Sequence, residues 1–248
     1  LTVSVAFGTV LKSKGINPCI MAGHSLGEYS ALVYSKSIDF TDAIKLVKLR
    51  GKYMQEAVPI GKGAMAAIIG GDVKMIEETC REFSKRGVVE PAGYNCPGQT
   101  VIAGDVDLID EAMKLIKERG AKLVKKLEVS APFHSSLLKP AGDRLAESLA
   151  SIDIKDPWIP YVDNFEAGVV TVAKNIKEKL IKQVYHPVLW EQSVLEMKKE
   201  FHVSHVVEVG PGKVLTGLVK KIDRTLECYT CDDEKTFENM VESIQKSS

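Results

Sequence analysis

The sequence predicts an α/β protein in which a large unit with a parallel sheet carries a smaller inserted unit. Two patterns favour this fold. A serine flanked by glycines stands between an apolar run and an amphipathic segment in residues 21–32, "MAGHSLGEYSAL". Residues 61–130 follow the order β-α-β-β-α-β, which is the ferredoxin-like arrangement. We therefore assign residues 1–60 and 131–248 to the large unit and residues 61–130 to the small one.

Composition narrows the classes of partner. The chain has 248 residues, of which 45% are hydrophobic and 27% are charged, and its 33 basic and 33 acidic side chains balance. The chain has no excess of basic charge that would indicate a nucleic-acid partner. No apolar run approaches the ~18 residues of a membrane span. Only Cys228 and Cys231 form a C-x2-C pair, whereas a structural zinc site needs about four ligands. We expect a cytoplasmic protein with free thiols, no bound metal and no cofactor.

The first sixty residues predict a helix, a strand, a tight turn and two further helices. Apolar residues at helical spacing indicate a helix from the first residue to Gly15, where glycine ends it. The run "NPCIMAG", residues 17–23, is typical of a buried parallel strand. A helix starts at Glu28 after the serine turn, and another spans residues 41–57. Because the first helix has no lead-in, we expect an N-terminal part of the protein to be absent from this chain.

The remaining elements alternate between strands and helices, as is typical of α/β folds. In the small unit we expect strands at 63–70, 88–95, 99–105 and 121–130, and helices at 72–87 and 106–120. In the rest of the large unit we expect a buried strand at 205–210 and helices at 135–150, 171–184, 188–201 and 211–222.

The turn Gly23-His24-Ser25-Leu26-Gly27 is a candidate nucleophile site. A serine hydroxyl needs a base to take its proton and donors to hold the oxyanion. A tight strand-to-helix turn projects the serine above the strand ends, and the N–H of Leu26 can face the oxyanion at the helix N-terminus. The two glycines are expected to avoid Cβ clashes in the turn. The strand and helix on either side favour a nucleophile at Ser25 over a purely structural turn.

Five histidines are candidates for the base. His24 adjoins the serine, but its direction at a sharp turn favours a packing role. His134 lies where the chain leaves the small unit, at a boundary where clefts are common. A conventional α/β-hydrolase places its histidine late in the chain, so His205 is the rival base. Spacing alone favours His134 only slightly.

A cationic residue interrupts the apolar face of the predicted helix 41–57. On a wheel of about 100° per residue, Arg50 falls near the centre of an arc formed by Ala43, Leu46, Val47, Tyr53, Met54 and Ala57. A buried guanidinium needs an anion, because an unpaired buried charge costs several kcal/mol. One interpretation is an internal ion pair with Asp or Glu. The other is that the planar fork binds a substrate carboxylate in two places.

Five segments, in order along the chain, resemble one enzyme family. They read "GHSLGEYSALV", "RGKYMQEAVPIGKGAMAAIIG", "YNCPGQTVIAG", "SAPFHSSLLKPA" and "EVGPGKVLTGLVKKI". With compatible spacing over essentially the whole chain, they resemble the malonyl-CoA:acyl-carrier-protein transacylases of bacterial fatty-acid synthesis. The resemblance implies an α/β-hydrolase-like large subdomain, a ferredoxin-like small subdomain, and a site in the cleft between them.

The resemblance also implies residue roles. Ser25 would be the acylated nucleophile and His134 its base, which the backbone carbonyl of Gln183 would orient. Arg50 would bind the free carboxylate of the malonyl group, in agreement with its place on the wheel. Phe133 precedes the histidine, as the phenylalanine that goes with malonyl rather than methylmalonyl selection does in related acyltransferase domains.

The implied substrates are malonyl-CoA and an acyl carrier protein. Asn95 is a candidate substrate contact, with a turn or strand-edge role as the alternative, and Lys125, Lys126 or Lys182 could supply a basic rim for the acidic carrier. The family begins with a strand and a "GQGSQ"-like segment that this chain lacks, so one oxyanion donor is expected to be missing. Two alternatives stay open: a serine thioesterase or esterase that uses His205, and a truncated inactive fragment that binds carrier protein.

Overall fold

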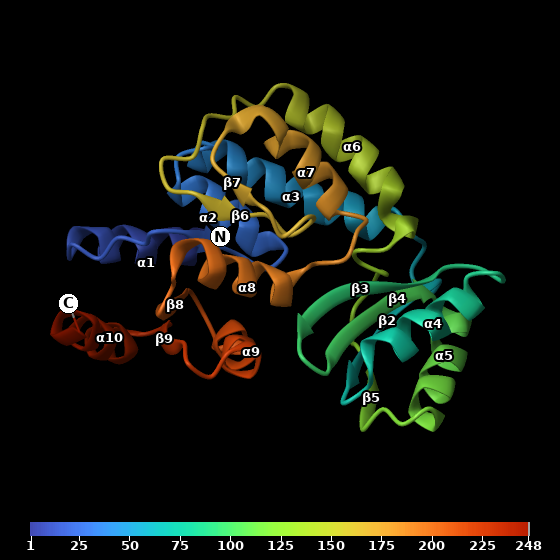
Figure 1. Cartoon of the computed structure of the whole chain (residues 1–248). Helices are drawn as coiled ribbons and strands as arrows, with labels where there is room; N and C mark the ends of the chain where they lie inside the picture. Colours follow the sequence, from blue (N-terminus) through green and yellow to red (C-terminus); the bar gives the residue numbers. More distant parts are fainter. Residues whose placement is uncertain (248) are drawn as a thin grey trace.

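The computed structural model describes the backbone of residues 1–247 and the side chains of residues 1–244 (Figure 1). Helices surround short strands over most of the chain, and a four-stranded sheet with two helices lies at one end of the molecule (Figure 1). The four strands of that sheet fall within residues 63–126. The predicted α/β fold is confirmed, whereas the unit boundaries at residues 60 and 130 stay a prediction.

The four-stranded sheet has the predicted β-α-β-β-α-β order. Its elements are β2 Gly63–Ile69, α4 Val73–Phe83, β3 Val89–Cys96, β4 Gln99–Asp105, α5 Val106–Glu118 and β5 Leu123–Lys126. The strands pair antiparallel in the spatial order β3-β4-β2-β5. Side chains from α4 and α5 bury Ile68 and Ile102 of the sheet in a core of their own. This is the ferredoxin-like arrangement.

The large unit contains two smaller sheets. The first has the order β1-β6-β7, in which β1 (Met21–Ala22) and β6 (Tyr161–Val162) are parallel and β7 (Val169–Val170) is antiparallel to β6. The second joins β8 (His205–Val209) and β9 (Glu227–Cys231) as a parallel pair. The expected parallel pairing is therefore found for two strand pairs, and β7 departs from it. Strands of two residues are too short to show a period, which is why β6 and β7 were not predicted.

Eight α-helices occur in the large unit over the described residues, namely α1 Thr2–Ser13, α2 Leu26–Tyr34, α3 Phe40–Glu56, α6 Lys139–Ala150, α7 Ile176–Gln183, α8 Trp190–Phe201, α9 Val214–Ile222 and α10 Glu234–Ser247. Short 3-10 turns, Ser136–Leu138 and Ala173–Asn175, precede α6 and α7. The predicted strand 17–23 is reduced to two residues, and Pro18 within it lacks the N–H that a strand ladder uses. The start of α3 follows from its cap, because the carboxylate of Asp39 accepts from Thr41 N at 2.8 Å.

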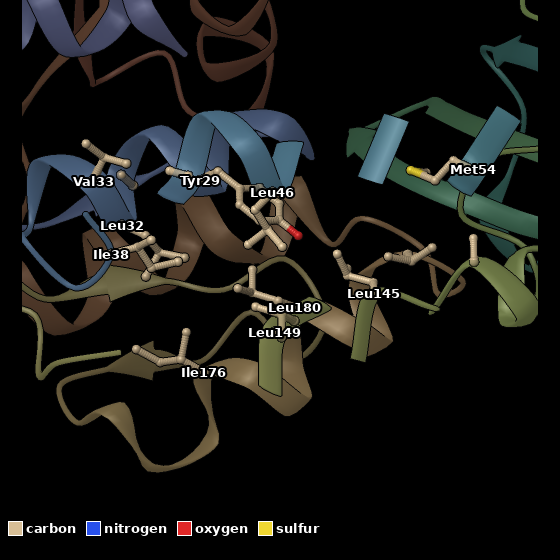
Figure 2. Close-up of a cluster of buried hydrophobic side chains, with 14 of the residues drawn as sticks. Tyr29, Leu32, Val33, Ile38, Leu46, Met54, Leu145, Leu149, Ile176 and Leu180 are labelled. Atoms are coloured by element: carbon tan, nitrogen blue, oxygen red, sulfur yellow. The ribbon is translucent and has the colours of Figure 1, made fainter. Parts of the chain in front are cut away.

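The main core lies where α2, α3, α6 and α7 meet. Figure 2 shows Tyr29 of α2, Leu46 of α3, Leu145 of α6 and Leu180 of α7 in this cluster, and all four are buried. Burial of this kind contributes about 1.5–3 kcal/mol per large apolar side chain. The cluster fixes α2 and α3 relative to α7, and these helices carry the polar residues described below.

Backbone pairing joins the four-stranded sheet to the large unit. Tyr94 N donates to Val188 O at 2.9 Å, and Val188 N donates to Ala92 O at 3.1 Å. The segment before α8 thereby extends the edge of the sheet at β3 in a parallel bridge at Gly93. The end of β3 is held next to the turn that contains Ser25.

Two kinds of feature are absent from the described residues. No helix there is long and apolar enough to cross a membrane. Among the described residues, no three or more His, Cys, Asp or Glu side chains are grouped so that they could hold a metal ion. The five cysteines have free thiols.

Candidate active site

Ser25 occupies a strained turn between β1 and α2. Its backbone has φ 52° and ψ −105°, and a positive φ is uncommon for a residue with a side chain. A Cβ on Gly23 would lie 2.0 Å from the carbonyl carbon of Gly27, so only glycine fits at position 23. Gly27 has open space at its own Cβ position, so the expectation that both glycines prevent clashes is wrong for Gly27. Leu26 supplies the first N–H of α2, which has no acceptor within the helix.

His134 is the histidine that reaches the serine. Its Nε2 lies 2.8 Å from Ser25 Oγ, and its Nδ1 lies 2.8 Å from the backbone oxygen of Gln183. A carbonyl oxygen only accepts, so Nδ1 carries the proton and Nε2 is left as the acceptor for the hydroxyl. This geometry is the one that a general base requires, and it has the same partners as the resemblance implies.

Arg50 is buried on α3, as its place on the helical wheel predicts. The residue is 6% exposed and lies in the same row of buried side chains as Leu46. Its Nη2 donates to Ser25 Oγ at 2.9 Å and to Gln183 Oε1 at 2.9 Å. Because Arg50 donates to Oγ, the hydroxyl hydrogen of Ser25 is directed to the imidazole.

No carboxylate neutralises Arg50 among the side chains described. No Asp or Glu oxygen of residues 1–244 lies within 4.0 Å of its nitrogens, so the internal ion pair does not form. Its guanidinium carbon lies 5.5 Å from the centre of the Tyr29 ring, and its Nε is buried without a hydrogen-bond partner among the described residues. A buried cation with neutral neighbours favours an anionic ligand.

The electrostatic setting keeps the imidazole neutral. Burial, followed by the positive charge of Arg50, lowers the pKa of His134 to about 3. The imidazole can therefore accept a proton from Ser25 without first losing one. The cationic donor on Oγ stabilises negative charge as that proton leaves, because hydrogen bonds from charged donors are the stronger ones.

Gln183 connects these groups from the end of α7. Its side-chain Nε2 donates to the backbone oxygen of Ser25 at 3.0 Å and to Glu28 Oε2 at 2.8 Å. Its Oε1 accepts from Arg50, while its backbone oxygen accepts from His134. A single residue therefore contacts the nucleophile turn, the cation and the imidazole.

Two buried polar residues of this cluster were not predicted. Asn164 Oδ1 accepts from Ser25 N at 2.6 Å, its Nδ2 donates to Gly23 O at 2.7 Å, and its own N donates to Glu28 Oε2 at 3.1 Å. A polar pair, Asp163-Asn164, follows the apolar run "WIPYV". That position at the carboxyl end of a parallel strand is the signal that could have indicated it.

The other predicted contacts lie close by but do different things. Phe133 packs against both the main core and the cluster around Met65 on β2. Asn95 Oδ1 accepts from His24 Nε2 at 3.0 Å, and the His24 ring lies 5.8 Å from that of Trp190. Burial lowers the pKa of His24. His24 is thus packed against β3 and α8, as its position in the turn suggests.

His205, the rival base, is engaged elsewhere. It opens β8, with Nδ1 2.8 Å from Ser204 Oγ, and its ring stacks on Tyr229 at 6.2 Å between centroids. The imidazole on Ser25 is that of His134. The esterase alternative therefore lacks its expected base at Ser25.

The lysines expected to form a basic rim are partly paired. Lys126 forms an ion pair with Asp110 at 2.7 Å, and Lys182 forms one with Glu178 at 2.6 Å. Lys125 is exposed on β5. The rim stays a prediction, with Lys125 as its least engaged member.

A cavity of about 740 Å³ lies beside the serine turn. Residues of α1, β1 and β8 line it together with Gly23, His24 and Gly27. Ser25, Arg50 and His134 are not among its lining residues over the described chain. The hydrogen-bonded cluster is therefore separate from this cavity and lies where the segment after β5 meets α2, α3 and α7.

Comparisons with known proteins agree with this geometry. The family model described as an acyl transferase domain matches residues 1–238. A Bacillus subtilis protein named malonyl CoA-acyl carrier protein transacylase is 45% identical over 249 residues, covering 100% of this chain and 78% of the relative. An Escherichia coli K12 protein of the same name is 50% identical over 227 residues, covering 91% of this chain and 73% of the relative.

Solved structures give the same result. An acyl carrier protein S-malonyltransferase from Vibrio cholerae has a TM-score of 0.93 at 46% identity, covering 96% of this chain and 78% of its own. A malonyl-transacylase in complex with its type II PKS acyl-carrier protein has a TM-score of 0.94 at 45% identity, covering 97% of this chain and 78% of its own. The chain belongs to the acyl transferase family and, within it, to the malonyl CoA-acyl carrier protein transacylases.

Proposed function

We propose that this chain transfers a malonyl group from malonyl-CoA to the phosphopantetheine thiol of an acyl carrier protein, through an ester on Ser25, in fatty-acid biosynthesis. One observation carries the proposal. The hydroxyl oxygen of Ser25 lies 2.8 Å from a neutral imidazole and 2.9 Å from a buried guanidinium that no acid of residues 1–244 neutralises. An activated serine beside a site for an anion suits an acyl group that ends in a carboxylate.

Acylation would begin with proton transfer from Ser25 Oγ to His134 Nε2. Oγ then attacks the thioester carbonyl carbon, and the oxygen of the tetrahedral intermediate accepts a hydrogen bond from Leu26 N–H. The C–S bond breaks, and His134 returns the proton to the departing coenzyme A sulfur. The products of this half-reaction are malonyl-Ser25 and free coenzyme A.

The second half-reaction would reverse these steps with a different thiol. His134 takes the proton of the phosphopantetheine thiol, and the sulfur attacks the ester carbonyl on Ser25. The C–O bond breaks, and His134 returns the proton to Oγ. The chemistry uses side chains and backbone groups throughout, so we expect no cofactor beyond the two substrates.

Arg50 would select the acyl group. Its Nη2 donates to Ser25 and Gln183, but its Nε is buried and has no hydrogen-bond partner in the part of the chain that the structure describes. A malonyl carboxylate would accept a hydrogen bond from this Nε–H, and its binding would place the thioester carbonyl next to Ser25. Phe133, which precedes His134 and packs between two cores, would limit the space for a branched acyl group.

We infer that the enzyme works in the cytoplasm. The free thiols of its five cysteines suit a reducing compartment. Proximity of Asn95 to the turn, through His24, makes it a candidate contact for the substrate arm.

Mass spectrometry after mixing with malonyl-CoA tests the proposal. We expect one malonyl adduct on Ser25 that disappears when holo acyl carrier protein is added, together with a malonylated carrier. Ser25→Ala should form no adduct. An intact chain that never gains the adduct would support the inactive-fragment alternative, and an adduct lost equally fast to water without carrier would support a thioesterase.

A further inference from the structure

Glu28 is a buried acid to which the proposed reaction assigns no role. It lies in the first turn of α2, three residues after the nucleophile, and is 0% exposed. One carboxyl oxygen, Oε2, accepts from Gln183 Nε2 at 2.8 Å and from Asn164 N at 3.1 Å. The other, Oε1, is buried with no partner in the described chain. Burying an acid without a paired cation costs free energy. The presence of Glu28 at this place therefore points to a role for the two hydrogen bonds that it accepts.

The first bond determines which way the Gln183 amide faces. Both hydrogens of Nε2 are used, one on Glu28 and one on the backbone oxygen of Ser25, which leaves Oε1 directed to Arg50. With the amide reversed, an oxygen would face two acceptors and an NH₂ group would face a guanidinium. Glu28 therefore supplies one of the acceptors that keep Gln183 in the orientation that binds Arg50.

The second bond connects Glu28 to the residue that holds the serine turn. Asn164 N donates to Glu28, while the Asn164 side chain binds Ser25 N on one side and Gly23 O on the other. These two bonds restrain the strained backbone at Ser25. Glu28 thus contacts both Asn164, which restrains the turn, and Gln183.

We propose that Glu28 is a positioning residue. By accepting hydrogen bonds from Gln183 and Asn164, its Oε2 keeps the Ser25 hydroxyl within hydrogen-bond distance of His134 and Arg50. The proposal rests on Ser25 being the acylated residue. Both bonds require an acceptor and neither requires a negative charge. Burial raises the pKa of Glu28 to about 8, an effect that Asp163 adds to and that Gln183, Asn164 and Arg50 oppose, so the carboxyl is largely neutral near pH 7.

Two variants of similar size separate an acceptor from a charge. Glu28→Gln keeps a carbonyl oxygen where Oε2 lies, whereas Glu28→Met keeps the length of the side chain and removes the acceptor. The readout is the rate at which a small alkyl fluorophosphonate labels Ser25, followed by mass spectrometry. This probe has no carboxylate and no coenzyme A, so it reports on the hydroxyl even in an enzyme that does not transfer malonyl groups.

We expect Glu28→Gln to label within about threefold of the parent protein and Glu28→Met to label roughly a hundredfold more slowly, as for other losses of reactive geometry. Equal rates for Glu28→Met and the parent would overturn the proposal, as would equal slowing of both variants. If Glu28→Met does not fold by circular dichroism, Glu28→Asp replaces it, because its shorter side chain withdraws the acceptor. A slow Glu28→Asp with a normal Glu28→Gln supports the proposal, and a slow Glu28→Gln contradicts it.

Malonyl loading, measured in parallel, separates the role of Glu28 from the proposed function. Normal fluorophosphonate labelling of the parent protein without malonyl transfer would contradict the proposed function alone. In that event the comparison of Gln and Met at position 28 still decides the role of Glu28.

Discussion

Arg50 and Ser25 share a hydrogen bond of 2.9 Å, from the guanidinium Nη2 to the hydroxyl oxygen. A buried cation therefore also touches the hydroxyl that we propose as the nucleophile. In the proposed reaction, substrate recognition and activation of the hydroxyl would both depend on this side chain. Arg50 lies on the buried face of α3, and Leu46 on the same face packs into the main core (Figure 2).

Replacing Arg50 should change the choice of acyl group. We expect Arg50→Met to lower malonyl loading of Ser25 by about ten- to a hundredfold relative to acetyl loading, since a hydrogen bond to a charged group contributes about 1.5–3 kcal/mol. Stopped-flow loading with malonyl-CoA and acetyl-CoA measures this ratio. Arg144→Met, which removes an exposed arginine paired with Glu56, is the matched control. Equal losses for both acyl groups would make Arg50 a structural residue.

The two candidate bases can be separated directly. His134→Ala should slow acylation of Ser25 by about a hundred- to ten-thousandfold, the usual contribution of a general base. His205→Ala should leave the acylation rate close to that of the parent protein, because His205 lies at the start of β8 and contacts Ser204, not Ser25. The reverse pattern would reassign the base to His205.

The two glycines of the serine turn should differ in stability. Gly23→Ala places a Cβ 2.0 Å from the backbone of Gly27, and we expect a loss of at least about 1–3 kcal/mol from overpacking. Gly27→Ala meets open space in the first turn of α2, so we expect no loss, or a gain of up to about 1 kcal/mol. Urea unfolding of both variants tests this difference. A Gly23→Ala protein as stable as the parent would show that the turn can relax.

Asn164 should contribute to the rate through the turn. Asn164→Ala removes the acceptor for Ser25 N and the donor to Gly23 O, and each unsatisfied buried group costs about 1–3 kcal/mol. We expect slower acylation and a lower free energy of unfolding. Asn95→Ala, which removes a single contact to His24, is the matched control and should have the smaller effect on both. A larger effect at Asn95 would contradict this assignment.

Stability should depend on pH through buried groups of opposite sign, among them Glu28 and His134. The pKa of Glu28 is raised from 4.5 to about 8, so the folded state binds the extra proton over that interval and stability falls as pH rises. The pKa of His134 is lowered from 6.5 to about 3, so the unfolded state binds the extra proton and stability falls as pH drops. Between pH 4.5 and 6.5 the two effects oppose each other.

Above pH 6.5 the contribution of Glu28 should remain alone. We expect the free energy of unfolding of the parent protein to decrease between pH 6.5 and 8 relative to that of Glu28→Gln, by at most about 1.4 kcal/mol per pH unit. Urea unfolding at several pH values measures the difference. Parallel curves for the two proteins would show that Glu28 does not titrate in this range.

Much of the site could be predicted from residues that are close in sequence. The serine turn follows from an apolar run, from Gly23, where no larger residue fits, and from the helix after the turn. Burial of Arg50 follows from the 3.6-residue period of α3. Asn164 and Glu28 escaped prediction because β6 has only two paired residues and because a lone acid in an apolar helix has no local signature.

By itself, then, the sequence determined most of the elements, the serine turn and the burial of Arg50, because helix and strand periods report on burial over short distances. The tertiary structure decided which of five histidines contacts Ser25, namely His134, 109 positions along the chain. It also decided that Asn164, 139 positions from Ser25, holds the turn. Such contacts depend on how whole helices pack, and no local pattern records that packing.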